Sequence, residues 1–221
     1  MIGYSDSNEN KINKLLNYVH AFFLSSIYFG ICNILFILPV YLLELNFYII
    51  FISLVFLGPA LVALCSFINK LIFDECFAVT KEFFRGYKNN FLSSLKVWIP
   101  LLIIASIIIF DLRLCLANGK FTLLIIPLTI MLIIDIILMS YSLVIISKYK
   151  IKTLDTLKLS LYLLIRNPFT SILNLAIIIL CTFILINSKS IIAFFIVSIG
   201  CFLVIKNMKN LFFFIDNTYL K

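Results

Sequence analysis

Six long apolar runs divide this chain, and they constrain its fold more than any other feature. By residue number they cover 16–43, 47–69, 97–112, 121–147, 169–186 and 191–205. A helix needs about 20 residues, with a range of about 17–25, to cross the hydrocarbon core of a bilayer. Backbone groups in that core must bond within their own segment, which favours helices. We therefore predict an all-α, polytopic transmembrane helical bundle with six spans, in a single membrane domain over residues 1–221.

The composition argues against a soluble domain. Hydrophobic residues make up 63% of the chain and charged residues 13%, whereas a soluble domain is about 45–50% apolar and about 25% charged. The net charge of +8 comes from clusters between apolar runs, where basic residues orient spans and contact anionic lipid headgroups. We therefore predict a lipid bilayer, rather than nucleic acid, as the partner of these clusters. The six cysteines are interpreted as small apolar residues, because they show no disulfide or metal-ligand spacing.

Two of the six runs are marginal as membrane spans. The third run lies between a basic connection and the charged pair Asp111 and Arg113. The sixth run has only 15 residues before Lys206, and the chain is apolar again at 211–215. Because a lysine can reach the interface from within a helix, the sixth span can shift or tilt. Whether 191–205 crosses the bilayer is left open.

The basic residues alternate between the two sides of the predicted bundle. All of them lie at the chain ends or in the connections 70–96 and 148–166, except Arg113, Lys120 and Lys189. The positive-inside rule then predicts that both ends, including the polar residues 1–15, are cytoplasmic. The abundance of Ile, Asn, Lys and Phe is typical of an AT-rich bacterial genome. We expect a multi-pass protein of a bacterial plasma membrane.

The second connection has the pattern of an amphipathic helix over residues 70–91. Its apolar side carries several phenylalanines, while its polar side carries Lys81, Arg85 and Lys88. Such a helix lies in the membrane interface or packs under the bundle, and both alternatives stay open. These three residues, together with Arg166 of the interfacial segment 148–168, are predicted to contact lipid headgroups or a partner.

Two short segments of the chain resemble each other. Residues 88–95 (KNNFLSSL) and 166–173 (RNPFTSIL) share a basic–Asn–x–Phe–x–Ser–x–Leu pattern that leads into an apolar run each time. Pro168 favours a break between an interfacial helix and the following span. The pattern suggests an internal duplication of a unit made of one helix and one hairpin.

The stretch from residue 58 to residue 111 also resembles a known family. It contains GPALVAL at 58–64, EFFRGYKNNF at 82–91, Trp98 and Pro100 in the next run, and Asp111; Arg166-Asn167-Pro168 follows later. This stretch resembles the YesL family of small bacterial membrane proteins of uncharacterised function, and the likeness covers most of residues 12–185. A longer first hairpin, before Gly58, departs from the family pattern. The resemblance implies an accessory role in carbohydrate uptake or utilisation, with a membrane partner such as a sugar permease, and it supplies no catalytic or ligand residues.

Asp135 is the sharpest candidate for a functional residue, because it lies near the centre of the fourth run. An ionised carboxylate at that depth costs at least about 2.5–3.5 kcal/mol, so it must be protonated, paired or exposed to water. One hypothesis makes Asp135 a proton or cation site, with Asn33 and Asn174 as possible partners. The other makes it a hydrogen-bonded group that fixes helix packing.

The remaining candidates favour structure over chemistry. Pro59 is expected to kink the second span, and the lone His20 to lie at the interface. No nucleotide-binding loop, nucleophile elbow or zinc-protease motif occurs in the sequence. We predict no enzyme activity, no cofactor and no metal. The function predicted first is that of an accessory or scaffold protein; the alternative is a small proton- or cation-coupled transporter that uses Asp135.

Overall fold

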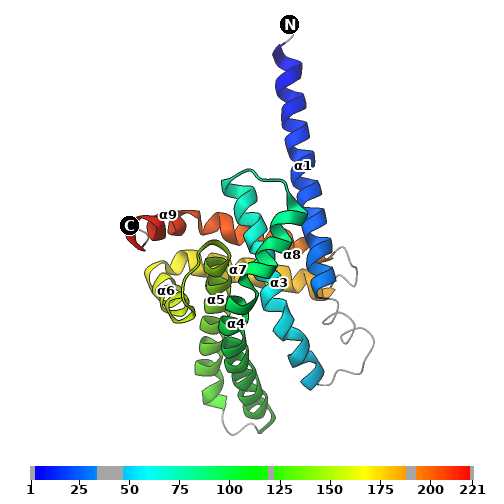
Figure 1. The fold of residues 1–221 in the computed structure, drawn as a ribbon. Coiled ribbons are helices and arrows are strands. Elements are labelled where there is room, and N and C mark those ends of the chain that lie inside the picture. The colour runs from blue at the N-terminus through cyan, green and yellow to red at the C-terminus, as the bar shows by residue number, and fades with distance from the viewer. Residues whose placement is uncertain (1–2, 34–46, 119–121, 188–192, 220–221) are drawn as a thin grey trace.

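The computed structural model describes residues 3–33, 47–118, 122–187 and 193–219, and all regular secondary structure in this part of the chain is helical (Figure 1). The prediction of an all-α protein is confirmed. The elements are α1 (Gly3–Cys32), α3 (Phe47–Phe73), α4 (Val79–Asn118), the 3₁₀ turn η1 (Thr122–Leu124), α5 (Ile125–Lys148), α6 (Thr153–Arg166), α7 (Pro168–Asn187), α8 (Ala193–Asn207) and α9 (Lys209–Tyr219).

Among the described residues, five helices are long and apolar enough to cross a membrane, and they are α1, α3, α4, α5 and α7. A sixth span results if α8 and α9 are taken together, although the chain bends by 50° between them. The multi-span architecture is therefore confirmed, with five or six spans. By itself α8 has 15 residues and is about 22 Å long, which is shorter than a hydrocarbon core of about 30 Å.

Several helix ends differ from the predicted runs. Helix α1 begins at Gly3, so most of the predicted polar extension is helical, and it ends at Cys32. The rest of the predicted first span, through residue 43, lies outside the described residues. The second, fourth and fifth runs match α3, α5 and α7 to within a few residues.

The prediction of a separate amphipathic helix over 70–91 is wrong. Residues 70–73 complete α3, the chain is non-helical over 74–78, and α4 then continues for 40 residues. The break contains Glu75, whose φ of 48° reverses the chain. Between residues 91 and 97 no glycine or proline ends the helix, so the charged turns and the third span form one rod about 60 Å long. This rod continues past Asp111 and Arg113, which makes the predicted third span, 97–112, too short.

The two similar segments have different backbones. Residues 88–95 lie inside α4, whereas residues 166–173 include the break between α6 and α7. Pro168 begins α7, where its missing N–H is not needed. The residues that the two segments share therefore do not mark equivalent junctions between helices.

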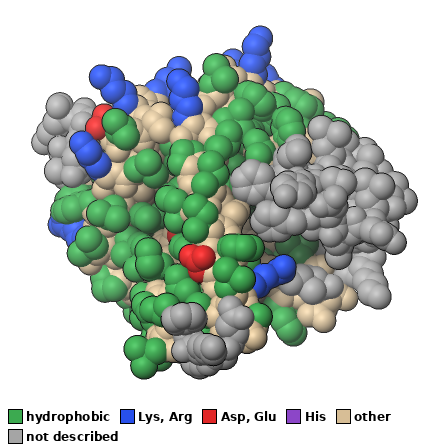
Figure 2. Space-filling view, turned by 90° about the horizontal axis from the view of Figure 1, so that it is seen from below, with side chains coloured by type: hydrophobic (Ala, Val, Ile, Leu, Met, Phe, Trp, Pro, Cys, Tyr) green, Lys and Arg blue, Asp and Glu red, His purple; other side chains and the backbone are tan. Residues whose placement is uncertain are grey.

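Tight packing in this protein is concentrated at one end, which we call the basic end. There α3 ends, α4 begins and α5 ends, and Lys70, Lys81, Arg85, Lys88, Lys148, Lys150 and Lys152 gather. The largest fully buried side chains come from α3, α4, α5, α6, α8 and α9, and they include Phe67, Phe83, Tyr141, Leu163, Met208 and Phe212. In contrast, α4 and α5 project together away from this core (Figure 1). Figure 2 shows many hydrophobic side chains on the described part of the face seen from below.

Helix α9 is fastened to the basic end by polar and aromatic contacts. The Tyr149 hydroxyl donates to Asp216 at 2.6 Å, and the Lys148 ammonium lies 3.1 Å from the same carboxylate. On the neighbouring helix α6, the guanidinium carbon of Arg166 lies 3.9 Å from the centre of the Phe214 ring. Helix α9 therefore lies beside the end of α5 and beside α6.

Candidate functional site at the basic end

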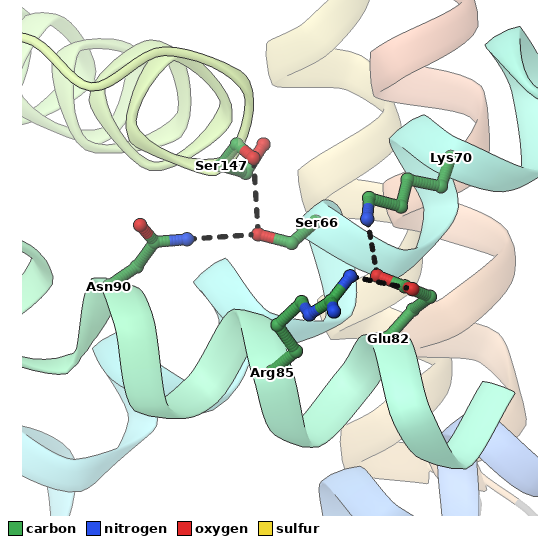
Figure 3. A network of polar contacts seen from close by, with 6 residues as sticks. All are labelled: Ser66, Lys70, Glu82, Arg85, Asn90 and Ser147. Carbon is green, nitrogen blue, oxygen red and sulfur yellow. Dashed lines mark hydrogen bonds and ion pairs between the residues drawn. The ribbon is translucent and has the colours of Figure 1, made fainter.

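An ion cluster around one buried carboxylate joins α3 to α4 at the basic end (Figure 3). Glu82, on the first turn of α4, is buried and accepts hydrogen bonds from Lys70 and from Arg85, the latter at 3.3 Å. The chain reversal at 74–78 places Glu82 opposite the last turn of α3, where Lys70 lies. Because a buried carboxylate is costly without partners, these two cations fix the angle between the helices.

Polar side chains extend this cluster toward α5 (Figure 3). The Asn90 amide donates to Ser66 Oγ at 3.2 Å, and Ser66 Oγ donates to the Ser147 carbonyl at 3.2 Å. The Asn69 amide donates to Ser147 Oγ at 2.6 Å. Three helices are therefore tied together at the level where the apolar runs end. Gly86 lets α4 approach this closely, because a Cβ there would lie 2.8 Å from the Ser66 Cβ.

Two adjoining cavities open beside this network. The first has a volume of about 290 Å³ and the second about 450 Å³. They share a wall that contains Asn89, Asn90, Ile146, Tyr149 and Lys150. Together they reach the size of the pockets that hold small molecules, about 300–1,000 Å³.

One polar atom beside the first cavity has no hydrogen-bond partner in the described part of the chain. Asn69 is 5% exposed and lines the cavity, and its Oδ1 makes no hydrogen bond with the described residues. This oxygen is enclosed by protein atoms, so the cavity does not reach it.

The lining of the two cavities differs in charge. Lys150 and Lys152 are exposed, line the second cavity and form no ion pair within the described residues. Lys150 also lines the first cavity, whose other cations are paired, Lys70 and Arg85 with Glu82 and Lys148 with Asp216. Both cavities therefore border the unpaired Lys150, and Lys152 lines only the second.

Tyr149 separates the cavities from α9. Burial raises the pKa of its phenol above the usual range, and the hydrogen bond to Asp216 raises that pKa further. The phenol therefore stays protonated and donates to Asp216 at neutral pH.

One comparison with known proteins finds a similarity. Residues 18–112 match the model of a family described as "Protein of unknown function, DUF624". This DUF624 region includes Ser66, Asn69, Glu82 and Asn90, but not the α5 wall of the cavities. No curated protein and no solved structure matches the chain.

Asp135 lies apart from the basic end. It is 4% exposed on α5, and its Oδ2 has no hydrogen-bond partner among the described residues. The structure does not join it to its predicted partners. The Asn33 amide donates to the Phe29 carbonyl at the end of α1, and Asn174 Oδ1 accepts from the Asn207 amide at 2.8 Å. Neither of the two cavities at the basic end includes Asp135.

The predicted contact residues lie at the surface of the basic end. Lys81, Arg85 and Lys88 are exposed on α4. Arg166 is exposed at the end of α6, where it donates to the Tyr162 hydroxyl. Pro59 is buried inside α3, which continues through it. In the described part of the chain, no group of three or more His, Cys, Asp or Glu residues is arranged to hold a metal ion.

The sequence analysis did not identify Ser66, Asn69, Ser147 or Tyr149. A signal was present, because Ser66, Asn69 and Lys70 are spaced i, i+3 and i+4 on one helical face at the end of an apolar run. Polar residues at a span end are also expected at any interface, so this spacing alone does not indicate a cavity.

Proposed function

We propose that this chain is a YesL-type accessory protein of a bacterial plasma membrane, which holds a membrane partner in carbohydrate uptake or utilisation, such as a sugar permease. The observation that carries the proposal is an exposed stripe along α4. It consists of Lys81, Phe84, Arg85, Lys88 and Leu92, which repeat at helical spacing. Large apolar side chains among cations suit a partner with an acidic and apolar surface.

The charge distribution supports a cytoplasmic position for this stripe. The connections that carry most of the basic residues meet at the basic end, and α9 is bound there as well. By the positive-inside rule, this end and both termini face the cytoplasm. A partner would then contact the cytoplasmic side of the membrane.

A photo-crosslinking amino acid placed at position 84 tests the proposal in living cells. We expect a crosslink to one membrane protein, identified by mass spectrometry as a component of sugar transport. Position 116 is the matched control, because Leu116 is also exposed on α4 but lies at its far end. Crosslinks to lipid alone at both positions would contradict a scaffold role. Loss of the crosslink in a Lys81→Glu, Lys88→Glu variant would assign it to the stripe.

A second function, proton- or cation-coupled transport, is favoured by Asp135. A buried carboxyl oxygen without a partner in the middle of a span is typical of an ion pathway. Carbodiimide labelling of the membrane-embedded protein tests this, with Asp135→Asn as the control. Labelling that increases as the pH falls, and that an added sugar or ion suppresses, supports transport. Absence of labelling at every pH means a sealed carboxyl that only packs helices.

A further inference from the structure

We propose that α6 binds the surface of the bilayer at the basic end, with its outer side among acyl chains and the guanidinium of Arg166 against a lipid phosphate. Helix α6 lies at one side of the bundle (Figure 1) and has 14 residues. At about 21 Å it is too short to cross the hydrocarbon core, so its length gives no reason for lipid contact. The inference does not depend on the partner proposed above, and it assigns lipid, rather than a partner, to Arg166.

The inner side of α6 is partly polar. Its buried residues are Thr156, Leu159, Ser160 and Leu163. The Ser142 hydroxyl of α5 donates to Ser160 Oγ at 3.2 Å. An amphipathic helix in water turns its apolar side inward and exposes its polar side. Because half of the buried positions of α6 carry hydroxyl groups, large apolar side chains are left on the outside.

An exposed apolar ridge follows the outer side of α6 and leads into α7. Leu161 is 48% exposed and Ile165 is 70% exposed, and they lie one turn apart on the same face. Only Asn167 separates α6 from α7, a candidate span whose first two turns expose Phe169 and Ile172. Since α7 enters the bilayer there, the ridge is continuous with a surface that faces lipid. Exposed apolar patches of this kind mark membrane contact.

The two edges of this ridge differ in polarity. At about 100° per residue, Tyr162 and Arg166 border the ridge on one edge, and both are exposed. Leu157 and Leu164 border it on the other edge, and both are half-buried. A helix that lies along a membrane surface has this arrangement, with its polar edge at the headgroups and its apolar edge toward the acyl chains.

The first half of α6 is more polar than the second. Leu154 is exposed between Lys152 and Asp155, and Lys158 follows one turn later, whereas no charged residue lies between Lys158 and Arg166. We therefore expect α6 to tilt, with residue 154 in water beside the headgroups and residue 165 among the acyl chains.

Arg166 is fixed in place for an anion at the polar edge. Its guanidinium carbon lies 3.9 Å from the centre of the Phe214 ring and 5.6 Å from that of the Tyr162 ring, and it donates to the Tyr162 hydroxyl. It forms no ion pair within the described residues. The guanidinium N–H groups that Tyr162 leaves free suit phosphate oxygens. An anionic lipid is therefore favoured over a zwitterionic one at this position.

Spin labels measure the depth of the ridge. Leu154→Cys, Leu161→Cys and Ile165→Cys each carry one nitroxide in a full-length variant without the six native cysteines, in vesicles of phosphatidylglycerol and phosphatidylcholine. Collisions with oxygen, which dissolves among acyl chains, are compared with collisions with a water-soluble nickel chelate. We expect oxygen collisions to dominate at positions 161 and 165, and nickel collisions to dominate at position 154, the control on the same face.

Native mass spectrometry of the full-length chain with its native cysteines measures the phosphate contact. After release from vesicles with equal amounts of the two lipids, we expect phosphatidylglycerol to be retained about tenfold more than phosphatidylcholine, and Arg166→Gln to remove this preference. Arg113→Gln is the matched control, because Arg113 is exposed on α4 and forms no ion pair with the described residues. It should keep the preference.

The proposal fails on any of three results. Nickel collisions that dominate at all three positions would place the ridge in water. Labels at 161 and 165 that neither reagent reaches would place the ridge against protein, such as a second copy of the chain. An unchanged lipid preference in Arg166→Gln would refute the phosphate contact, and this measurement holds even if the cysteine-free variant does not fold. None of these results concerns the α4 stripe, so failure here is distinguishable from failure of the crosslinking experiment.

Discussion

At the scale of single residues, close approach between α3 and α4 depends on Gly58. A Cβ at this position would lie 2.4 Å from Cγ of Trp98, whose indole N–H donates to the Leu54 carbonyl at 2.9 Å. The ring cannot move away without losing that bond. The contact therefore makes Gly58 a position where any side chain forces the two helices apart.

Gly58→Ala should lower the free energy of unfolding by about 1–3 kcal/mol, because overpacking displaces Trp98. Gly30→Ala is the control, since an added Cβ there meets nothing within 4 Å and Ala favours a helix. Thermal unfolding in detergent, followed by Trp98 fluorescence, measures both variants. Equal melting temperatures would show that α3 and α4 are less closely packed than described.

Tyr149→Phe should destabilise the protein by about 1 kcal/mol at neutral pH, through loss of the hydrogen bond to Asp216. The pKa of Tyr149 is raised from its usual 10.0 in the folded chain. The stability it contributes is therefore complete below the unfolded pKa and is lost as the pH rises beyond it. Melting temperatures from about pH 9 to about pH 11 should converge for the two proteins. A constant difference would contradict the assigned bond.

Residue-scale features differed in how far the sequence could predict them. The place of Asp135 within a long helix followed from its apolar run, whereas its burial depends on which face of α5 packs against protein. The cavity wall could not be predicted from the sequence, because Ser66, Asn90 and Ser147 come from three different helices. A sequence pattern shows only which residues are neighbours on the same helix. Asn69 illustrates the limit: its spacing from Ser66 was readable, whereas its unpartnered oxygen depends on how α5 packs.

At the scale of elements, α4 is a single rod that joins the charged end to a membrane span. Apolar runs predicted α3, α5 and α7 well, because a helix that contacts lipid must consist mostly of apolar residues. The continuity of α4 between residues 91 and 97 was not predicted. The amphipathic segment before residue 91 and the apolar run after residue 97 look like two helices when each pattern is taken separately. Only the absence of a breaker indicated continuity.

Asn90→Pro tests this continuity. A proline inside a helix removes a backbone hydrogen bond and costs about 3 kcal/mol or more. Asn90→Ala is the control, because it removes the side-chain bond to Ser66 and keeps the backbone intact. We expect Asn90→Pro to melt well below Asn90→Ala in detergent. Similar melting temperatures would mean that a helix break is tolerated here, as it is at Pro168 between α6 and α7.

At the scale of the whole molecule, the helices at the basic end determine the topology. We propose that residues 88 and 154 face the cytoplasm and residue 123 faces the opposite side. Single cysteines at Lys88, Leu154 and Leu123, introduced into a variant without the six native cysteines, test this with a membrane-impermeant maleimide. Leu123 is 86% exposed and Leu154 71%, so both should react readily once their side is accessible.

Labelling of intact cells should modify position 123 alone, and positions 88 and 154 should react only after the membrane is opened. Labelling of positions 88 and 154 from opposite sides of the membrane would contradict the proposed arrangement of five or six spans. Labelling of all three from outside would reverse the proposed orientation without changing the fold.

The concentration of packing at the basic end has a consequence for the far halves of α4 and α5. Among the described residues these halves have few protein neighbours, so lipid chains supply most of their lateral support. Membrane thickness then acts on them directly: a thin bilayer favours tilting of the pair, and a thick bilayer favours an upright pair. The basic end, held by its own core, would stay unchanged in both. The chain is thus rigid where it meets water and adjustable where it meets acyl chains.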